Sequence, residues 1–166
     1  LITYPRSDSR HLPVEQHNLA PNVIQAIGQN CSALKDYSEL AQPRLKSKAF
    51  NDSKVEAHHA IVPSEKSISA AQFEKLNQFE QKIYRHIARQ YLMQFFPAYQ
   101  YAETKVEAEI AGGLFKTQAK QPLKLGWKAL YGEKKSGTNK SAKQTDSAQT
   151  LPPINLDSSD KQHGKY

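Results

Sequence analysis

The sequence predicts an α+β fold, in which a mostly helical part is followed by a β-hairpin. Two observations support this class. Apolar residues recur at helical intervals from Phe73 to Phe95, and capping-box pairs mark helix starts at Ser69 and Asn77. After Pro97 the pattern changes to alternation, with apolar residues at positions 106, 108 and 110. A change of period from helical to two-residue indicates a helical region joined to strands.

The N-terminal stretch LITYPRSDSR begins with a short apolar run. Pro5 disfavours helical backbone at the residue before it, so Tyr4 is expected at the end of an extended segment. Pro21 suits the first turn of a helix that contains Val23, Ile24 and Ile27 and closes near Gly28. Residues 32–53 are expected to form a polar, basic loop with room for one helical turn.

The clearest elements lie in the middle of the chain. Residues 69–95 are predicted to form one long helix or two abutting helices, ended by Pro97. In the following hairpin, the apolar residues 106, 108 and 110 face one side and the charged residues 105, 107 and 109 face the other. The turn is expected at Gly112–Gly113. Because a two-stranded hairpin is marginally stable alone, its partner strands are expected elsewhere.

These elements divide the chain into four parts. Residues 1–97 form a helical domain, and residues 98–131 form a β segment that includes the apolar cluster LGWKALY. Residues 132–150 are polar and basic and are interpreted as a flexible linker. Residues 151–166 are interpreted as a short extended segment or tail.

Composition narrows the classes of function. Lysine and arginine number 23 against 16 aspartate and glutamate, so the net charge of +7 favours a polyanionic partner. The single cysteine excludes an internal disulfide and a zinc site built on several cysteines. No apolar stretch is long enough to span a membrane, and the N-terminus has no secretory signal pattern. We therefore interpret the chain as intracellular, and the lack of an initiator methionine as the mark of a piece of a longer protein.

Tyr4 and Arg6 are the first candidate chemical pair. A phenol is a poor nucleophile at neutral pH unless positive charge or a general base favours the phenolate. An arginine two residues along an extended segment lies on the same side and can hold a phosphate through its planar fork. The pair fits phosphodiester transesterification. The alternative is a strand-end tyrosine with its ring on the core and its hydroxyl in water.

The sequence AHHA at residues 57–60 is the second candidate. Adjacent histidines point in different directions, which is poor spacing for a shared metal ion. One of them is better suited to donate to a phosphate and carry a proton. The alternative is a partly exposed histidine beside a core segment.

The third candidate set lies on the predicted long helix. Tyr84 and Tyr91 have the spacing of core residues, with base stacking as the alternative. Arg85 and Arg89 belong either to a solvated face or to a set of nucleic-acid backbone contacts.

Taken together, the stretches YPRSD and AHHAI resemble the type IA DNA topoisomerases, and these residues are most similar to the topoisomerase III branch. The resemblance continues through GWKALY at residues 126–131. It implies that Tyr4 is the nucleophile that attacks single-stranded DNA and becomes linked to the 5′ phosphate. Arg6 would position the scissile phosphate, and His58 would contact a DNA phosphate near the break. Further DNA-binding residues are expected at His59, Ser7, Asp8, Arg10, Arg85 and Arg89.

The resemblance also implies an architecture. The tyrosine would lie on a winged-helix-like domain, and the hairpin would belong to a toroidal arch, to which residues 151–166 could contribute a segment. Mg²⁺ would be bound by a separate acidic domain of the intact enzyme, so no metal ligand is assigned here and this chain alone is expected to be inactive. We expect a monomeric, cytoplasmic, nucleoid-associated bacterial enzyme that relaxes or decatenates DNA without ATP.

Two alternatives to a topoisomerase remain. A relaxase or rolling-circle nuclease also uses tyrosine and histidine, but it needs a His-hydrophobe-His metal pair, which this sequence lacks. The alternative from another class is a non-catalytic helical module that binds the DNA backbone.

Overall fold

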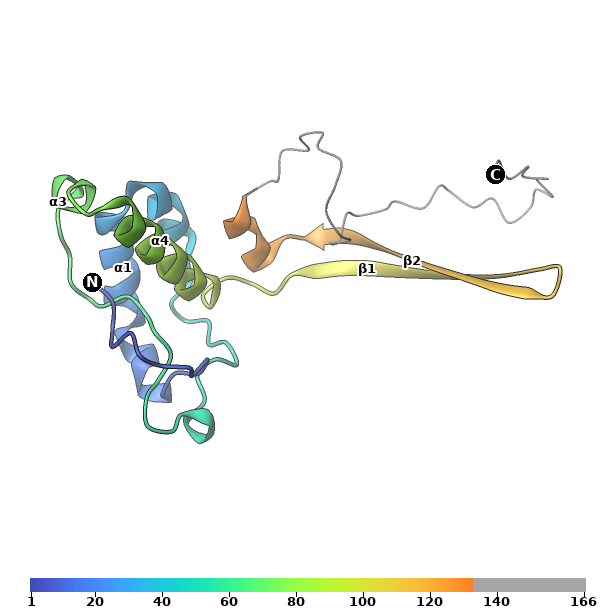
Figure 1. The fold of residues 1–166 in the computed structure, drawn as a ribbon, viewed down its shortest axis with the longest axis horizontal. Coiled ribbons are helices and arrows are strands. Elements are labelled where there is room, and N and C mark those ends of the chain that lie inside the picture. The colour runs from blue at the N-terminus through green and yellow to red at the C-terminus, as the bar shows by residue number, and fades with distance from the viewer. Residues whose placement is uncertain (133–166) are drawn as a thin grey trace. The chain divides into compact units, whose positions relative to one another are not determined.

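The computed structural model describes residues 1–132, which fall into two compact units. The helical unit comprises Leu1–Tyr99 together with the segment that begins at Leu125, and the hairpin unit comprises Gln100–Lys124. Figure 1 shows helices in the first and a pair of long strands in the second. The α+β class is thereby confirmed. The predicted linker and tail, from residue 133 onward, lie outside the described residues.

The helical unit is built from short helices and one long helix. In chain order they are the 3-10 helix η1 (Val14–Leu19), α1 (Ala20–Asn30), the 3-10 helix η2 (Ser32–Leu34), α2 (Lys35–Leu40), the 3-10 helix η3 (Asp52–Lys54), α3 (Ala70–Glu74), α4 (Gln78–Met93) and the 3-10 helix η4 (Gly126–Tyr131). In the described part of the chain, no helix has both the length and the apolar character that a membrane crossing requires.

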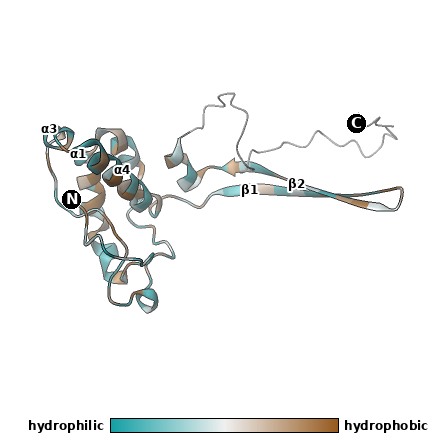
Figure 2. Ribbon diagram, in the orientation of Figure 1, coloured by the Kyte–Doolittle hydropathy of each residue, from teal (hydrophilic) through white to brown (hydrophobic). Residues whose placement is uncertain are grey.

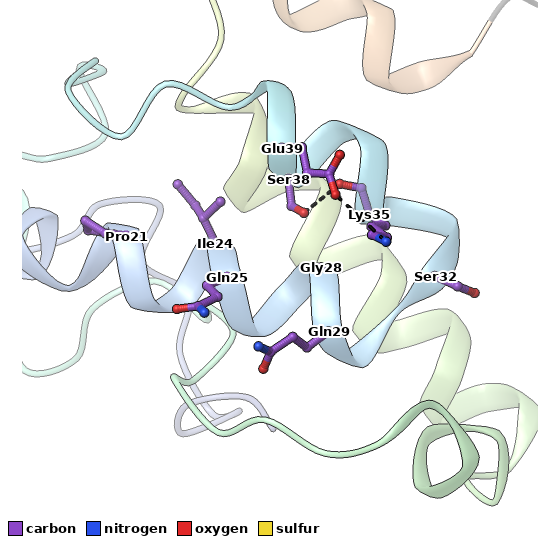
Figure 3. Close-up of a pocket in the computed structure, with 9 residues that line it drawn as sticks. All are labelled: Pro21, Ile24, Gln25, Gly28, Gln29, Ser32, Lys35, Ser38 and Glu39. Atoms are coloured by element: carbon purple, nitrogen blue, oxygen red, sulfur yellow. Dashed lines mark hydrogen bonds and ion pairs between the residues drawn. The ribbon is translucent and has the colours of Figure 1, made fainter.

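Helix α1 contains Pro21 in its first turn, as predicted, but it continues past Gly28 to Asn30. Gly28 lies inside the helix and faces α2, where an added Cβ would collide with the Ser38 hydroxyl. The glycine therefore serves a close helix–helix approach rather than a helix end. Figure 3 shows the groove along these two helices, with Ser38 donating to Lys35 O at 2.6 Å.

Two separate helices, α3 and α4, occupy the region where one long helix or two abutting helices were predicted. Both capping boxes are formed. Ser69 Oγ accepts from Gln72 N at 3.2 Å, and Asn77 Oδ1 accepts from Glu80 N at 3.0 Å. The reciprocal bonds, from Ser69 N to Gln72 Oε1 and from Asn77 N to Glu80 Oε2, are each 2.9 Å. Each helix start thus satisfies backbone donors that would otherwise be unpaired.

One core joins the helices of this unit, and Figure 2 shows apolar residues along α1 and α4. Asn30 is its buried polar residue, with 1% of its surface exposed. Its Nδ2 donates to Tyr84 Oη at 3.0 Å and to Lys66 O at 2.9 Å, and its Oδ1 accepts from Ile68 N at 2.7 Å. Because the amide nitrogen and the amide oxygen of Asn30 are both hydrogen-bonded, the chain between Val62 and α3 is fixed to α1 and α4 without leaving an unpaired buried group. The most fully buried large side chains of the unit include Phe73, Phe95, Ile27, Leu34, Leu92 and Leu130.

The hairpin unit consists of β1 (Gln100–Ile110) and β2 (Gly113–Lys124), paired antiparallel. The pairing of Ile110 with Gly113 leaves Ala111 and Gly112 as the loop, with φ of 51° and 79°. Positive φ at both positions is what a type I′ hairpin turn requires. The turn is therefore one residue earlier than the predicted Gly112–Gly113, because Gly113 is already paired in the ladder.

The two faces of the hairpin alternate as predicted. Val106 pairs with Thr117 and Ala108 with Phe115 on one face, and Glu107 pairs with Lys116 on the other. Lys116 Nζ lies 2.7 Å from Glu107 Oε1, and Lys120 Nζ lies 3.8 Å from Glu103 Oε1. Cross-strand pairs of opposite charge add a small stabilisation to each rung.

The segment that begins at Leu125, which the sequence grouped with the β segment, belongs to the helical unit, and its residues Gly126–Tyr131 form η4. Trp127 N donates to Pro97 O at 3.0 Å, and Leu130 is buried in the core. Gly126 permits this contact, because its φ is +49° and an added Cβ would overlap the carbonyl oxygens of Pro97 and Ala98. The apolar residues of LGWKALY fit both periods, since positions 125, 127, 129 and 131 alternate while positions 127, 130 and 131 have helical spacing.

We expect Gly126→Ala to destabilise the helical unit more than Gly132→Ala. Both glycines have positive φ, and Gly132, with φ 73° and ψ 158°, lies in a region essentially restricted to glycine, so each alanine carries backbone strain of about 1–3 kcal/mol, but nothing lies within 4 Å of an added Cβ at Gly132. The overlap with backbone oxygens at Gly126 should add about 1–3 kcal/mol. Urea unfolding of the two variants measures the difference. Equal decreases in stability would mean that the close approach at Gly126 has no role in holding η4.

Candidate active site

A short antiparallel pairing holds the segment that leads into Tyr4. Ile2 and Pro63 form an isolated bridge, and Thr3 N donates to Val62 O at 2.9 Å. The Thr3 hydroxyl oxygen accepts from Val62 N at 3.0 Å. These bonds place the start of the chain beside the residues that directly follow AHHA.

A second set of bonds fixes the loop after Tyr4. The Ser7 hydroxyl donates to His59 O at 2.8 Å, and Ala60 N donates to His11 O at 2.8 Å. Bonds at Thr3, Ser7 and His11 therefore tie the loop of residues 4–10 to residues 59–62 on both sides and in its middle. The serine and proline content of SDSRHLP suits such a loop, because hydroxyls bond readily to nearby backbone.

Tyr4 and His58 lie side by side in this arrangement. Their ring centroids are 5.0 Å apart with an angle of 45° between the planes. Tyr4 is 56% exposed and His58 is also exposed. The phenol is thus held by the backbone around it rather than by burial, and both rings are open to a ligand.

Arg6 is exposed and makes no hydrogen bond or ion pair with any residue from 1 to 132. Its guanidinium therefore keeps all of its donors for a ligand. Because Arg6 lies between Tyr4 and Ser7, its backbone belongs to the same anchored loop.

His59 has a different environment from His58. It is partly buried, and its Nδ1 lies 2.7 Å from Ala60 O. A carbonyl oxygen only accepts, so Nδ1 carries the proton and Nε2 is the atom left for another contact. The backbone carbonyl of His59 also accepts from Ser7. His59 therefore contributes to holding the loop as well as presenting a ring.

A shallow groove of about 360 Å³ continues from His58 along the loop. Asp8 and Arg10, both predicted from the sequence, line it. Sequence reasoning missed Lys54, His11 and Glu56, which line the same groove. The signal that could have found Lys54 is its position four residues before His58 in KVEAH, in a segment already selected for its histidines.

Arg85 and Arg89 lie elsewhere, on α4. The Arg85 Nη2 donates to Gln81 Oε1 at 3.0 Å, and its guanidinium carbon lies 5.8 Å from the centroid of the Phe73 ring. The Nε atoms of both arginines are buried and have no hydrogen-bond partner in the described part of the chain. These contacts place Arg85 against α3, and none connects either arginine to the tyrosine loop.

Tyr84 and Tyr91 are core residues, with 3% and 4% of their surface exposed. Burial raises the pKa of Tyr84, a rise that the hydrogen bond with Asn30 opposes. Burial also raises the pKa of Tyr91, and the nearby Glu65 carboxylate adds to the rise. Because both rings are buried, they offer no open face for a base, so the base-stacking alternative is not supported. The raised pKa of each phenol keeps it protonated, so neither is a nucleophile.

The donor atoms of the described residues do not gather into a metal site. Within residues 1–132, no three histidine, cysteine, aspartate or glutamate side chains lie close enough together to hold one ion. Asp8 and Glu56 share the groove with Arg10 and Lys54, which favours charge balance over a cation site. The described residues therefore do not fit a magnesium site.

A family model described as DNA topoisomerase matches residues 1–163. The chain belongs to the DNA topoisomerase family. It is 46% identical over 154 residues to DNA topoisomerase 3 of Vibrio cholerae, a match that covers 93% of this chain and 22% of that protein. The resemblance identified from YPRSD and AHHAI is confirmed by this match.

Other topoisomerase relatives agree. The chain is 46% identical over 136 residues to DNA topoisomerase 3 of Pasteurella multocida, covering 82% of this chain and 20% of that protein. It is 35% identical over 158 residues to DNA topoisomerase 3 of Bacillus subtilis, covering 93% and 20%. The chain thus spans about a fifth of the length of these relatives.

We expect Ser7→Ala to loosen the tyrosine loop. Loss of the bond to His59 O should lower the local stability by about 1 kcal/mol, the usual contribution of one hydrogen bond. Amide hydrogen exchange at Ala60 and Thr3 measures the effect, and exchange should be about fivefold faster at both. Ser32→Ala is the matched control, because Ser32 is exposed and outside this loop. Unchanged exchange in Ser7→Ala would contradict the anchoring role.

Proposed function

We propose that this chain is the tyrosine-bearing part of a type IA DNA topoisomerase that cleaves and rejoins single-stranded DNA. The observation that carries the proposal is the exposed Tyr4 phenol held beside His58 by backbone pairing. Membership of the DNA topoisomerase family supplies the substrate class.

The reaction proposed at Tyr4 is a transesterification. The phenolic oxygen attacks the phosphorus of a DNA phosphodiester, a P–O bond to Tyr4 forms, and the P–O3′ bond breaks. The 3′ oxygen takes up a proton and the phenol loses one. The DNA 5′ phosphate is then linked to Tyr4. In the reverse step the 3′ hydroxyl attacks the phosphotyrosine and restores the phosphodiester. One ester replaces another in each direction, so rejoining requires no ATP.

The neighbours of Tyr4 suit this reaction. Arg6 has an unengaged guanidinium that can bind two phosphate oxygens and oppose the charge that builds on them. His58 lies against the Tyr4 ring and can donate to a phosphate oxygen. Ser7, Asp8, Arg10 and His59 share the anchored loop or its partner segment and would bind flanking DNA. For Arg85 and Arg89, contacts to more distant DNA are part of the same proposal.

The described residues offer no suitable set of donors for magnesium. In this proposal the ion is therefore bound by another part of the enzyme. In the family, an acidic domain would hold Mg²⁺, and the present chain would meet that domain at its tyrosine loop. We propose that the chain by itself is inactive for this reason. With the rest of the enzyme it would act as a monomer that relaxes or decatenates DNA in the cytoplasm of a bacterium, associated with the nucleoid.

Tyr4→Phe should abolish covalent capture of DNA. The test uses a chimera in which this chain replaces the matching segment of Vibrio cholerae DNA topoisomerase 3, because the two are 46% identical there. A single-stranded oligonucleotide labelled at its 3′ end is mixed with the chimera and Mg²⁺, and the reaction is stopped in denaturant. A labelled protein band is expected for the chimera and not for Tyr4→Phe, since phenylalanine has no attacking oxygen.

Tyr37→Phe is the control for this test, because Tyr37 is a partly buried tyrosine outside the loop. It should retain the labelled band. A band that persists in Tyr4→Phe would refute the role of Tyr4 as nucleophile. A folded chimera that binds DNA without forming a band would favour the non-catalytic DNA-binding module.

Arg6→Ala should slow formation of the labelled band about a hundredfold, the usual effect of removing one donor to a developing charge. Arg6→Lys should recover only part of the rate, since an ammonium cannot bind two oxygens in the same plane. The initial rate of adduct formation at saturating DNA measures both. Arg44→Ala, at another exposed arginine, is the control. A rate in Arg6→Ala equal to that of this control would contradict a role at the scissile phosphate.

A further inference from the structure

A second groove of the helical unit combines lysine and aromatic side chains. Its volume is about 660 Å³, within the range of ligand sites. We call it the lysine–aromatic groove and define it by Lys46, Lys48, Gln90, Gln94, Trp127 and Tyr131. It shares no lining residue with the groove beside His58.

The charge of this groove is positive and uncompensated. Lys46 and Lys48 are exposed, and neither has a hydrogen bond or ion pair with residues 1–132. No aspartate or glutamate lines the groove. Nearby, the Lys128 Nζ lies 3.8 Å from the centroid of the Tyr99 ring. The groove therefore favours an anionic ligand over a neutral one.

Tyr131 is the exposed ring of the groove, and Trp127 is partly buried against the core beside it. Tyr131 is 56% exposed, and its ring meets that of Trp127 at a centroid distance of 6.2 Å and an angle of 71°. Gln90 Nε2 donates to Tyr131 Oη at 3.2 Å, and Trp127 N donates to Pro97 O at 3.0 Å. A ring that is both exposed and fixed loses little conformational freedom when a planar ligand stacks on it.

The segment that carries Lys46 and Lys48 is bonded to the C-terminal end of α4, the helix that also holds Tyr131 through Gln90. Gln94 Oε1 accepts from Ser47 Oγ at 2.7 Å, and Gln94 Nε2 donates to Gln90 O at 3.0 Å. Ser47 lies between Lys46 and Lys48 in the chain, so this contact sets the position of both lysine backbones. Cations and aromatic rings are thus presented together by one side of α4.

We propose that the lysine–aromatic groove binds single-stranded DNA, with phosphates at Lys46 and Lys48 and a base stacked on Tyr131 or Trp127. Cations along a groove with exposed aromatic rings are the combination that binds unpaired strands. Duplex DNA offers the phosphates but keeps its bases stacked, so it would use only the lysines. The proposal rests on the proposed function in taking DNA as the substrate, but it does not depend on cleavage at Tyr4.

The single tryptophan of the chain provides a direct readout, because Trp127 lies in the groove. The intrinsic fluorescence of the 166-residue chain is followed as an oligothymidylate is added. A matched oligonucleotide of abasic sugar phosphates and a duplex of the same length are titrated in parallel. Quenching that saturates with the oligothymidylate and is weak with the other two is expected.

Variants distinguish the contribution of the aromatic ring from that of the two lysines. Tyr131→Ala should weaken oligothymidylate binding at least about fivefold, the effect of removing one stacked base. The double variant Lys46→Ala with Lys48→Ala should reduce the salt dependence of the binding constant by about 0.7 for each phosphate that the groove no longer neutralises. Lys75→Ala with Lys82→Ala removes the same charge from exposed positions outside the groove and should reduce it less. Circular dichroism of each variant verifies the fold.

The outcomes distinguish this proposal from the one for Tyr4. Saturable quenching in a Tyr4→Phe background supports the groove whether or not the chimera forms an adduct. Absence of quenching by oligothymidylate overturns it, even if the chimera cleaves DNA. Equal effects of the two lysine double variants would also overturn it, because binding would then follow net charge alone. Equal quenching by the abasic strand would show that no base stacks in the groove, and this result would also overturn the proposal.

Discussion

The arrangement of the candidate site depends on one constraint, the antiparallel pairing of residues 1–3 with residues 62–64. Tyr4 and His58 are far apart in the chain, and their exposed rings have too little buried surface to hold each other in place. The pairing uses backbone groups and the Thr3 hydroxyl, so it fixes the position of the loop without engaging the side chains of Tyr4 and Arg6. The phenol and the guanidinium at Arg6 therefore remain open to a ligand.

The stability of this pairing comes in turn from the core beneath it. Asn30 makes bonds on both sides, to Tyr84 on α4 and to the backbone at 66 and 68. The chain that carries Val62 and Pro63 is thus fixed between a histidine segment at one end and a buried amide at the other. Functional side chains on an exposed loop that is held by a rigid core are the usual arrangement in binding and catalytic sites. Tyr84 is buried and supports the core, whereas Tyr4 is exposed on the loop.

Local signals in the sequence predicted local features well. The capping boxes at Ser69 and Asn77 formed, and alternation after Pro97 gave the faces of the hairpin, because both depend only on near neighbours. Features set by distant partners were not predictable in the same way. Gly28 faces α2, and η4 packs on the helices rather than on the strands. The proximity of Tyr4 and His58 came from the family resemblance, since no spacing rule connects them.

The basic side chains of the two described units differ in how they are paired with carboxylates. In the hairpin, Lys116 and Lys120 lie within 4.0 Å of glutamates on the facing strand, so positive charge is largely balanced where it occurs. In the described part of the helical unit, the one ion pair joins Lys35 and Glu39 at 4.0 Å, and its other basic side chains have no carboxylate at that distance. Cations without internal partners can bind a polyanion, and displace its counterions, without first breaking an ion pair of the protein. Among residues 1–132, most of the positive charge without a carboxylate partner therefore belongs to the helical unit, the unit that also presents Tyr4.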